Sequence, residues 1–250
     1  MKTKTKLPRL KITVNKALLT ALTVLVSLSC QAQEWDFSTW HKVAVKGELT
    51  KKLSLSVEQQ LRLQENSSAI DEMFTEIGLG YDLPKGFAIS GAYRLGWSPD
   101  DEGFYNNRHR YNIDLKYDRK IWKLQAKVRA RFQHRPSNHL LNDRLEPNDS
   151  PAFARIKLSV NYRKLKKWTP GLEFETFIRL DSPIETGVTR FRYRAFLDYD
   201  LPKRQELGLF YMLQTDFSGN TPAFVSVVGV SYSYEWKRPK KKKKKKKGDK

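Results

Sequence analysis

The chain has 250 residues, of which 39% are hydrophobic and 12% aromatic, and it carries a formal net charge of +20. This composition argues against a bundle of membrane-spanning helices and against a disordered chain, and the length suits one domain. The charge does not indicate nucleic-acid binding, because six positive charges precede residue 33 and a net ten follow residue 236, which leaves +4 between them. We therefore expect one all-β domain with no nucleic-acid partner.

Residues 1–32 have the layout of a secretory signal peptide. Six basic residues precede an apolar run at 17–28, and small residues follow it. The run is shorter than the roughly 20 residues of a membrane-spanning helix, so we expect cleavage after Ala32. The alternative is a lipoprotein acylated at Cys30, although Ser27 stands where lipoprotein signals usually have leucine.

Residues 33–236 alternate between apolar and polar side chains with period two, which predicts β-strands. In 53–63, for example, Leu53, Leu55 and Val57 share one face while Ser54 and Glu58 lie on the other. Ten such segments are expected, after a weaker first strand at 40–49. The ten are 53–63, 73–81, 87–97, 111–117, 122–132, 154–162, 172–180, 190–199, 207–215 and 224–236.

The connections between these strands favour a membrane barrel over a soluble lipocalin-like one. They are short after residues 49, 81, 117, 162 and 199 and mostly longer after 63, 97, 132, 180 and 215, as in outer-membrane barrels with short periplasmic turns. The short turns follow a tyrosine, whose ring suits the interface between lipid and water. These interface tyrosines are Tyr81, Tyr117, Tyr162 and Tyr199.

We therefore predict an antiparallel up-and-down transmembrane β-barrel of about 10–12 strands in the outer membrane of a Gram-negative bacterium, in contact with outer-membrane lipid. An odd count conflicts with the even numbers of bacterial barrels, so 35–49 is expected to hold two short strands, or to lie in the lumen or along the rim. The strand 225–236 looks like the final strand read by the barrel assembly machinery. The lysine-rich residues 237–250 are expected to be a disordered tail.

Three features of the region 33–236 occur together: Trp40 followed by residues 53–62, Tyr93-Arg94 after the turn at 84–86, and the strands that hold Arg155 and 192–194. With these features the region resembles the Bacteroidota outer-membrane barrels of a domain family of unknown function, DUF2490. The resemblance implies the fold and the location. It implies no activity.

The polar face of the strands would line the barrel interior, where we seek a function. The lumen-lining candidates are Arg94, Arg110, Lys127, Arg129, Arg131, Arg155, Lys157, Glu173, Glu175, Arg179, Arg190, Arg192 and Arg194. The acids Glu58, Glu76, Asp114 and Asp198 also lie on this face. Ion pairs across a narrow lumen would make a structural plug; the alternative is a narrow, anion-preferring channel with a basic constriction.

An enzyme of the outer membrane is a further alternative, which the sequence supports weakly. No Gly-x-Ser-x-Gly or His-Glu-x-x-His motif accompanies His41, His109, His134 and His139. We therefore expect no catalytic residues, no metal site and no cofactor. The loops at 98–107 and 134–150 could instead bind an external partner that the sequence does not identify.

Overall fold

The computed structural model describes residues 35–99, 103–136, 150–163, 165–181, 187–217 and 222–236. The expected signal peptide with Cys30, the lysine-rich tail and His139 lie outside these residues. No helix among the described residues is long and apolar enough to span a membrane.

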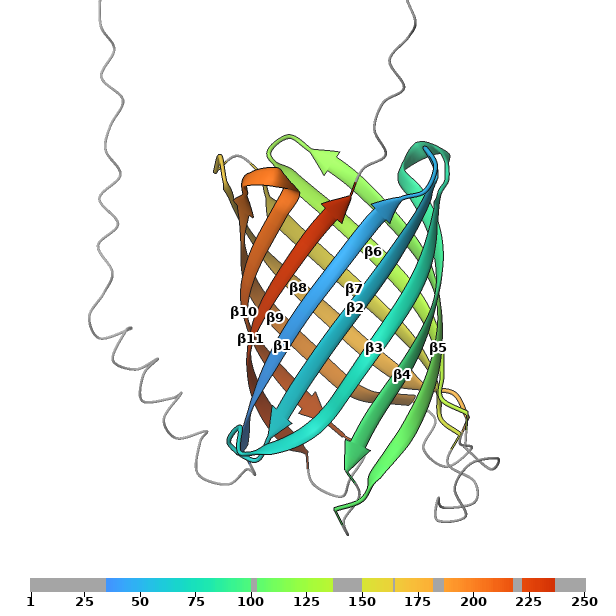
Figure 1. Cartoon of the computed structure of the whole chain (residues 1–250), viewed down its shortest axis with the longest axis vertical. Coiled ribbons are helices and arrows are strands. Elements are labelled where there is room, and N and C mark those ends of the chain that lie inside the picture. The colour runs from blue at the N-terminus through green and yellow to red at the C-terminus, as the bar shows by residue number, and fades with distance from the viewer. Residues whose placement is uncertain are drawn as a thin grey trace, which may run out of the picture. The chain divides into compact units, whose positions relative to one another are not determined.

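The described residues form one closed sheet of eleven strands (Figure 1). The strands are β1 (Trp35–Glu48), β2 (Leu53–Gln64), β3 (Ala69–Asp82), β4 (Phe87–Pro99), β5 (Tyr105–Ile121), β6 (Leu124–His134), β7 (Ala152–Tyr162), β8 (Trp168–Arg179), β9 (Gly187–Leu201), β10 (Gln205–Asp216) and β11 (Ala223–Trp236). Two single-turn 3₁₀ helices, η1 (Pro84–Gly86) and η2 (Pro202–Arg204), join β3 to β4 and β9 to β10. The predicted all-β barrel is confirmed, and its strand number lies within the predicted range.

Ten of the neighbouring strand pairs are antiparallel, and each joins strands that follow one another in the chain. The barrel closes differently, because β1 and β11 pair in parallel from Trp35 opposite Phe224 to Gly47 opposite Trp236. Figure 1 shows their arrowheads, blue and red, pointing to the same upper rim. A wholly antiparallel barrel is therefore the wrong description at this seam.

The first strand corrects another prediction. Residues 35–48 form a single strand in the barrel wall, and they neither split into two strands nor lie in the lumen. The reason is visible in the alternation: Trp35, Phe37, Val43 and Val45 all lie on one exposed face. With this strand the count is odd, and the two ends of the sheet must run parallel to meet.

The connections fall into two sets that define two rims. The turn rim holds the short connections after β1, β3, β5, β7 and β9, and the loop rim holds those after β2, β4, β6, β8 and β10. The repeated Leu-Pro-Lys segments form the same turn twice, with Lys85 and Lys203 both in the left-handed region at φ 61° and 60°. Because β1 and β11 are parallel, Trp35 lies at the loop rim and Trp236 at the turn rim.

The hairpin of β5 and β6 is longer than expected. Residues 118–121 were expected to connect the strands 111–117 and 122–132, but they continue β5, where Asp118 pairs with Lys127 and Lys120 with Gln125. The turn lies at Trp122, which was predicted as strand; it has φ 55° and is 83% exposed. These polar pairs across β5 and β6 extend the β-sheet pairing past Tyr117. Alternation of apolar residues alone does not predict this extension.

The apolar face of the barrel points outward. Val43, Ile113 and Leu209 are 53%, 58% and 54% exposed, whereas Arg110 and Asp114, on the opposite face of β5, are 8% and 3% exposed. Alternation with period two fixes this division along every strand. The arrangement is the reverse of a soluble lipocalin-like barrel, whose apolar face points inward.

A small apolar cluster interrupts the polar interior where β10 and β11 meet. It consists of Phe210, Met212 and Val227, with Trp40 packed against it. Gly229 leaves room for the Phe210 ring, since a Cβ at this glycine would lie 2.0 Å from the ring carbon Cζ. The glycine therefore sets how closely the ring packs on the wall.

We expect Gly229→Ala to destabilise the barrel by about 2 kcal/mol, because the added methyl group must displace a buried ring. Urea unfolding in detergent, followed by gel mobility, would measure the free energy. Gly91→Ala is the matched control, since its nearest atom to a new Cβ is 3.9 Å away. Equal stability of the two variants would contradict the close packing of Phe210 on Gly229.

Candidate functional site: the lumen cavity

The barrel interior contains a cavity of about 410 Å³, here called the lumen cavity. It extends from the middle of the barrel, at Lys42 and Glu173, to the loop rim, at Arg135 and Asp216. Of the predicted lumen residues, twelve line it: Arg94, Arg110, Arg129, Arg131, Arg155, Lys157, Glu173, Glu175, Arg179, Arg190, Arg192 and Arg194. Lys127 lies on the same face nearer the turn rim and does not line the cavity.

The charge of this lining is strongly positive. Thirteen lysine and arginine side chains and five carboxylates line the cavity among the described residues. The carboxylates are Glu58, Glu76, Glu173, Glu175 and Asp216. A cavity with this excess attracts anions and repels cations, because the surrounding wall screens charge poorly.

One group of ion pairs is centred on Glu72 of β3. Its carboxylate lies 3.0 Å from Arg62, 3.4 Å from Arg110 and 3.9 Å from Arg94. Arg94 also donates from Nε to Glu76 at 2.8 Å. The sequence analysis missed Glu72, because the expected strand began at residue 73. The register of β2 and β3 continues unbroken to Arg62 opposite Glu72, and a bulge shifts it only beyond this pair.

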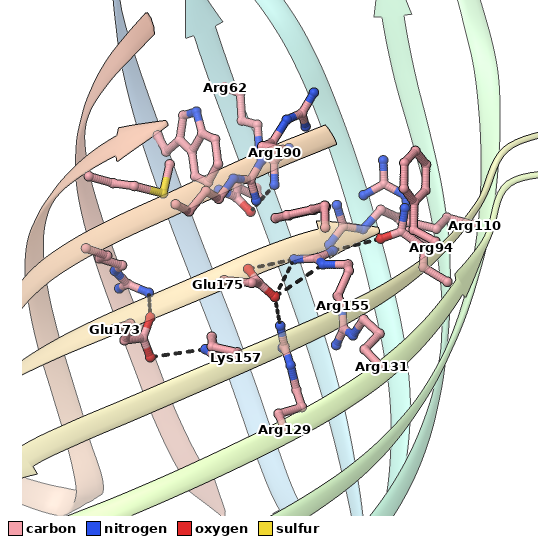
Figure 2. Close-up of a pocket in the computed structure, with 18 of the residues that line it drawn as sticks. Arg62, Arg94, Arg110, Arg129, Arg131, Arg155, Lys157, Glu173, Glu175 and Arg190 are labelled. Carbon is pink, nitrogen blue, oxygen red and sulfur yellow. Dashed lines mark hydrogen bonds and ion pairs between the residues drawn. The ribbon is translucent and has the colours of Figure 1, made fainter. Parts of the chain in front are cut away.

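A second group is centred on Glu175 of β8. Arg155 donates from Nη2 to both carboxylate oxygens at 2.9 Å, and Arg129 pairs with the same carboxylate (Figure 2). Arg155 also donates from Nη1 to the Oε1 atom of Gln133 at 2.7 Å. One buried carboxylate therefore holds two guanidinium groups from β6 and β7.

The inner end of the cavity holds a third group. Glu173 accepts a hydrogen bond from Lys157 at 3.1 Å (Figure 2). It also accepts hydrogen bonds from Arg194 at 3.1 Å and from Ser159 at 3.2 Å. Nearer the turn rim, Asp198 does not line the cavity. On the side of the turn rim, the lining of β7, β8 and β9 ends at Lys157, Glu173 and Arg194.

Two arginines pair with acids nearer the ends of strands. Arg190 pairs with Asp216 of β10, and Arg179 lies 3.3 Å from Asp181, which follows β8. Arg131 lies outside these groups and donates from Nε and Nη2 to Asp114 at 2.6 and 2.9 Å. Asp114 was expected on the polar face, and its position opposite Arg131 in the register explains the pair.

Aromatic rings contact the guanidinium groups in an alternating series along the wall. The ring of Phe74 lies between Arg94 at 3.4 Å and Arg62 at 5.0 Å from the guanidinium carbon to the ring centroid. The ring of Trp40 lies between Arg62 at 4.0 Å and Arg192 at 5.3 Å. The ring of Phe177 lies between Arg192 at 4.7 Å and Arg155 at 4.1 Å. Contacts of this kind stabilise a cation by the negative charge of the ring face. The series was not predicted, because the aromatic residues stand at single inward positions between polar ones.

The interface tyrosines all lie on the outward face of their strands. Tyr81, Tyr162 and Tyr199 lie within two residues of the ends of β3, β7 and β9, whereas Tyr117 stands four residues before the end of β5. Phe87 packs on Tyr117 at 4.7 Å and Trp168 on Tyr199 at 4.5 Å between ring centroids. Aromatic pairs therefore lie on the outer face near the turn rim.

The described histidines lie outside the lumen cavity. His109 contacts the Tyr93 hydroxyl at 2.7 Å from its Nδ1 atom, and this pair is exposed on the outer face. The described residues contain no cluster of three or more His, Cys, Asp and Glu side chains that could hold a metal ion.

Fold and interior together define the class of protein: a closed β-barrel, apolar outside, with an arginine-rich interior. A family model described as "Protein of unknown function (DUF2490)" matches residues 37–224, so the chain belongs to this family.

Two solved structures are similar to parts of the chain. The β domain of the Bordetella autotransporter BrkA is 11% identical over 70% of this chain and 78% of that one, with a TM-score of 0.42. The NanC porin is 12% identical over 71% of this chain and 86% of that one, with a TM-score of 0.46. No curated protein matches the chain.

We expect Glu175→Gln to lower the free energy of unfolding by about 3 kcal/mol, because it leaves Arg129 and Arg155 without their shared negative partner. Urea titration of the refolded barrel would measure this. In the control Glu58→Gln, the lost partner Lys42 is 3.8 Å away and both side chains are about 30% exposed, so the loss is about 0.5 kcal/mol or less. A Glu175→Gln barrel as stable as the control would show that the ion pairs of Glu175 with Arg129 and Arg155 contribute nothing to the free energy of unfolding.

Proposed function

We propose that this protein is an integral outer-membrane β-barrel whose narrow, arginine-lined lumen favours anions over cations. The observation that carries the proposal is the lining of the lumen cavity, with its thirteen cationic and five anionic side chains among the described residues. Neutral or cationic solutes gain nothing from such a lining, whereas a small anion is stabilised by it.

Membrane insertion is supported by the outer face of the barrel. The shortest strands, β6 and β7, have 11 residues and the longest, β5, has 17, and roughly 9–11 residues of tilted strand cross a bilayer. Apolar side chains on this face would be costly in water and suit lipid. The secretory signal expected at 1–32 would direct such a chain out of the cytoplasm.

The directions of the ion pairs support an open path over a plug. Glu72, Glu76, Asp114, Glu173 and Glu175 each pair with cations on neighbouring or next-neighbouring strands, along the wall. The expected plug needs pairs between opposite sides of the barrel. These five carboxylates narrow the lumen without bridging it.

A non-conducting barrel, whose cavity opens only at the loop rim, is the second candidate. The lining ends at Lys157, Glu173 and Arg194, and Lys127 and Asp198 beyond them do not contribute to it. In this case anions would enter from the loop rim and bind without crossing. Electrical recording separates the two candidates.

For the location, we expect the protein to stay in carbonate-washed outer membranes and to migrate faster on a detergent gel before boiling than after. A closed barrel resists unboiled detergent and unfolds on heating. Fractionation and paired gel lanes would test this. Release of the protein by osmotic shock, with one mobility in both lanes, would contradict membrane insertion.

For the selectivity, we expect small currents in planar bilayers whose reversal potential, in a potassium chloride gradient, has the sign of the chloride equilibrium potential. Lys42→Glu should reduce this preference, because Lys42 lines the cavity. Lys85→Glu makes the same charge change in the exposed turn η1, outside the lumen, and should leave the preference nearly unchanged. A cation-selective current would refute the proposal, and no current would favour the non-conducting barrel.

A further inference from the structure

Arg192 of β9 differs from the other arginines around it. It lines the lumen cavity, and its Nε atom donates to the Oε1 atom of Gln214 at 2.8 Å. Among the described residues it pairs with no carboxylate. Its neighbours are different: Arg190 pairs with Asp216, Arg155 with Glu175 and Arg62 with Glu72.

The orientation of the Arg192 guanidinium is fixed by three strands. Its central carbon lies 5.3 Å from the ring of Trp40 on β1 and 4.7 Å from the ring of Phe177 on β8, and Gln214 holds Nε from β10. An arginine fixed in this way has already lost the side-chain freedom that binding would otherwise cost. Its terminal N–H groups donate no hydrogen bond to the described residues.

The charges around Arg192 favour an anion at this point. Arg155 and Arg190 contact the same Phe177 ring and Arg62 the same Trp40 ring, so three cations lie around Arg192 and repel it, while Glu175 attracts it. That carboxylate is already shared by Arg129 and Arg155. An unpaired guanidinium among other guanidinium groups is unfavourable in a poorly screened interior, and a bound anion relieves the repulsion.

We propose that Arg192 anchors an oxyanion-binding site in the lumen cavity, which takes the carboxylate or phosphate group of a small ligand. Two terminal N–H groups of a fixed guanidinium match two oxygens of such a group, which a spherical halide cannot imitate. A cavity of about 410 Å³ has the size of a site for a small organic molecule. The inference deepens the proposed anion preference, to which it adds a defined binding group.

The test is the thermal unfolding of the detergent-purified full chain in sodium chloride, sodium acetate and sodium phosphate at equal ionic strength. A ligand that binds only the folded barrel raises the unfolding temperature with its concentration. We expect wild type to be stabilised by acetate or phosphate relative to chloride. The stronger of the two identifies the group as carboxylate or phosphate.

Variants separate specific binding from the general effect of phosphate, which stabilises folded proteins by exclusion from their surface. Arg192→Gln should raise the dissociation constant for the effective oxyanion by roughly tenfold or more. Arg192→Lys keeps the charge but loses the paired N–H groups, so it should also weaken binding. Lys127→Gln removes one charge outside the cavity and should bind as wild type does.

Identical unfolding temperatures of wild type in the three salts would overturn the inference, as would oxyanion stabilisation that persists in both Arg192 variants. If Arg192→Gln fails to fold, Arg192→Lys decides alone. The measurement needs no current through the barrel. A barrel that binds acetate without conducting refutes only the channel, and one that conducts chloride without binding oxyanions refutes only the Arg192 site.

Discussion

The contact between guanidinium groups and aromatic rings makes this barrel interior possible. Alternation with period two brings more arginines inside than there are carboxylates to pair with them. Burying an excess of charge is costly, and ring faces reduce that cost without adding negative groups. Phe177 shows the effect most directly, since the guanidinium groups of Arg155, Arg192 and Arg190 lie 4.1, 4.7 and 5.5 Å from its ring.

The carboxylates have a different role from the rings. Glu72 and Glu175 each gather guanidinium groups from two or more strands, and so they act as cross-links within the wall. The rings then accommodate the cations that remain. The result is an interior whose charged groups are held along the wall and whose lining carries an excess of positive charge.

Much of the fold could be predicted from the sequence, because one physical rule acts along the whole chain. Alternation placed Arg155, Arg192 and Glu175 on the inward face, where the structure has them. It failed where the rule is broken locally. Glu72 falls just outside the strand expected at 73–81, because a bulge beyond it interrupts the alternation, and Trp122 looks like an apolar strand residue although the backbone turns there.

Contacts between residues far apart in the chain could not be predicted from the sequence for a different reason. The contact of Trp40 with Arg192 joins β1 to β9 and exists only because the sheet closes. The parallel seam likewise depends on the strand count, which is a property of the entire chain. Local patterns specify which face a side chain takes, while closure decides which side chains meet.

The odd strand count also limits how this chain could be rearranged. In many domains the two termini lie close together, and a short linker permits circular permutation. Here the start of β1 and the end of β11 lie at opposite rims, separated by the length of a 14-residue strand, roughly 45 Å at 3.3 Å per residue. A linker between them would have to pass through the arginine-lined interior or along the apolar outer wall. The order of the strands in the gene is therefore tied to the architecture. A circular permutant with new termini at a turn would have its linker across either the lumen or the outer apolar face.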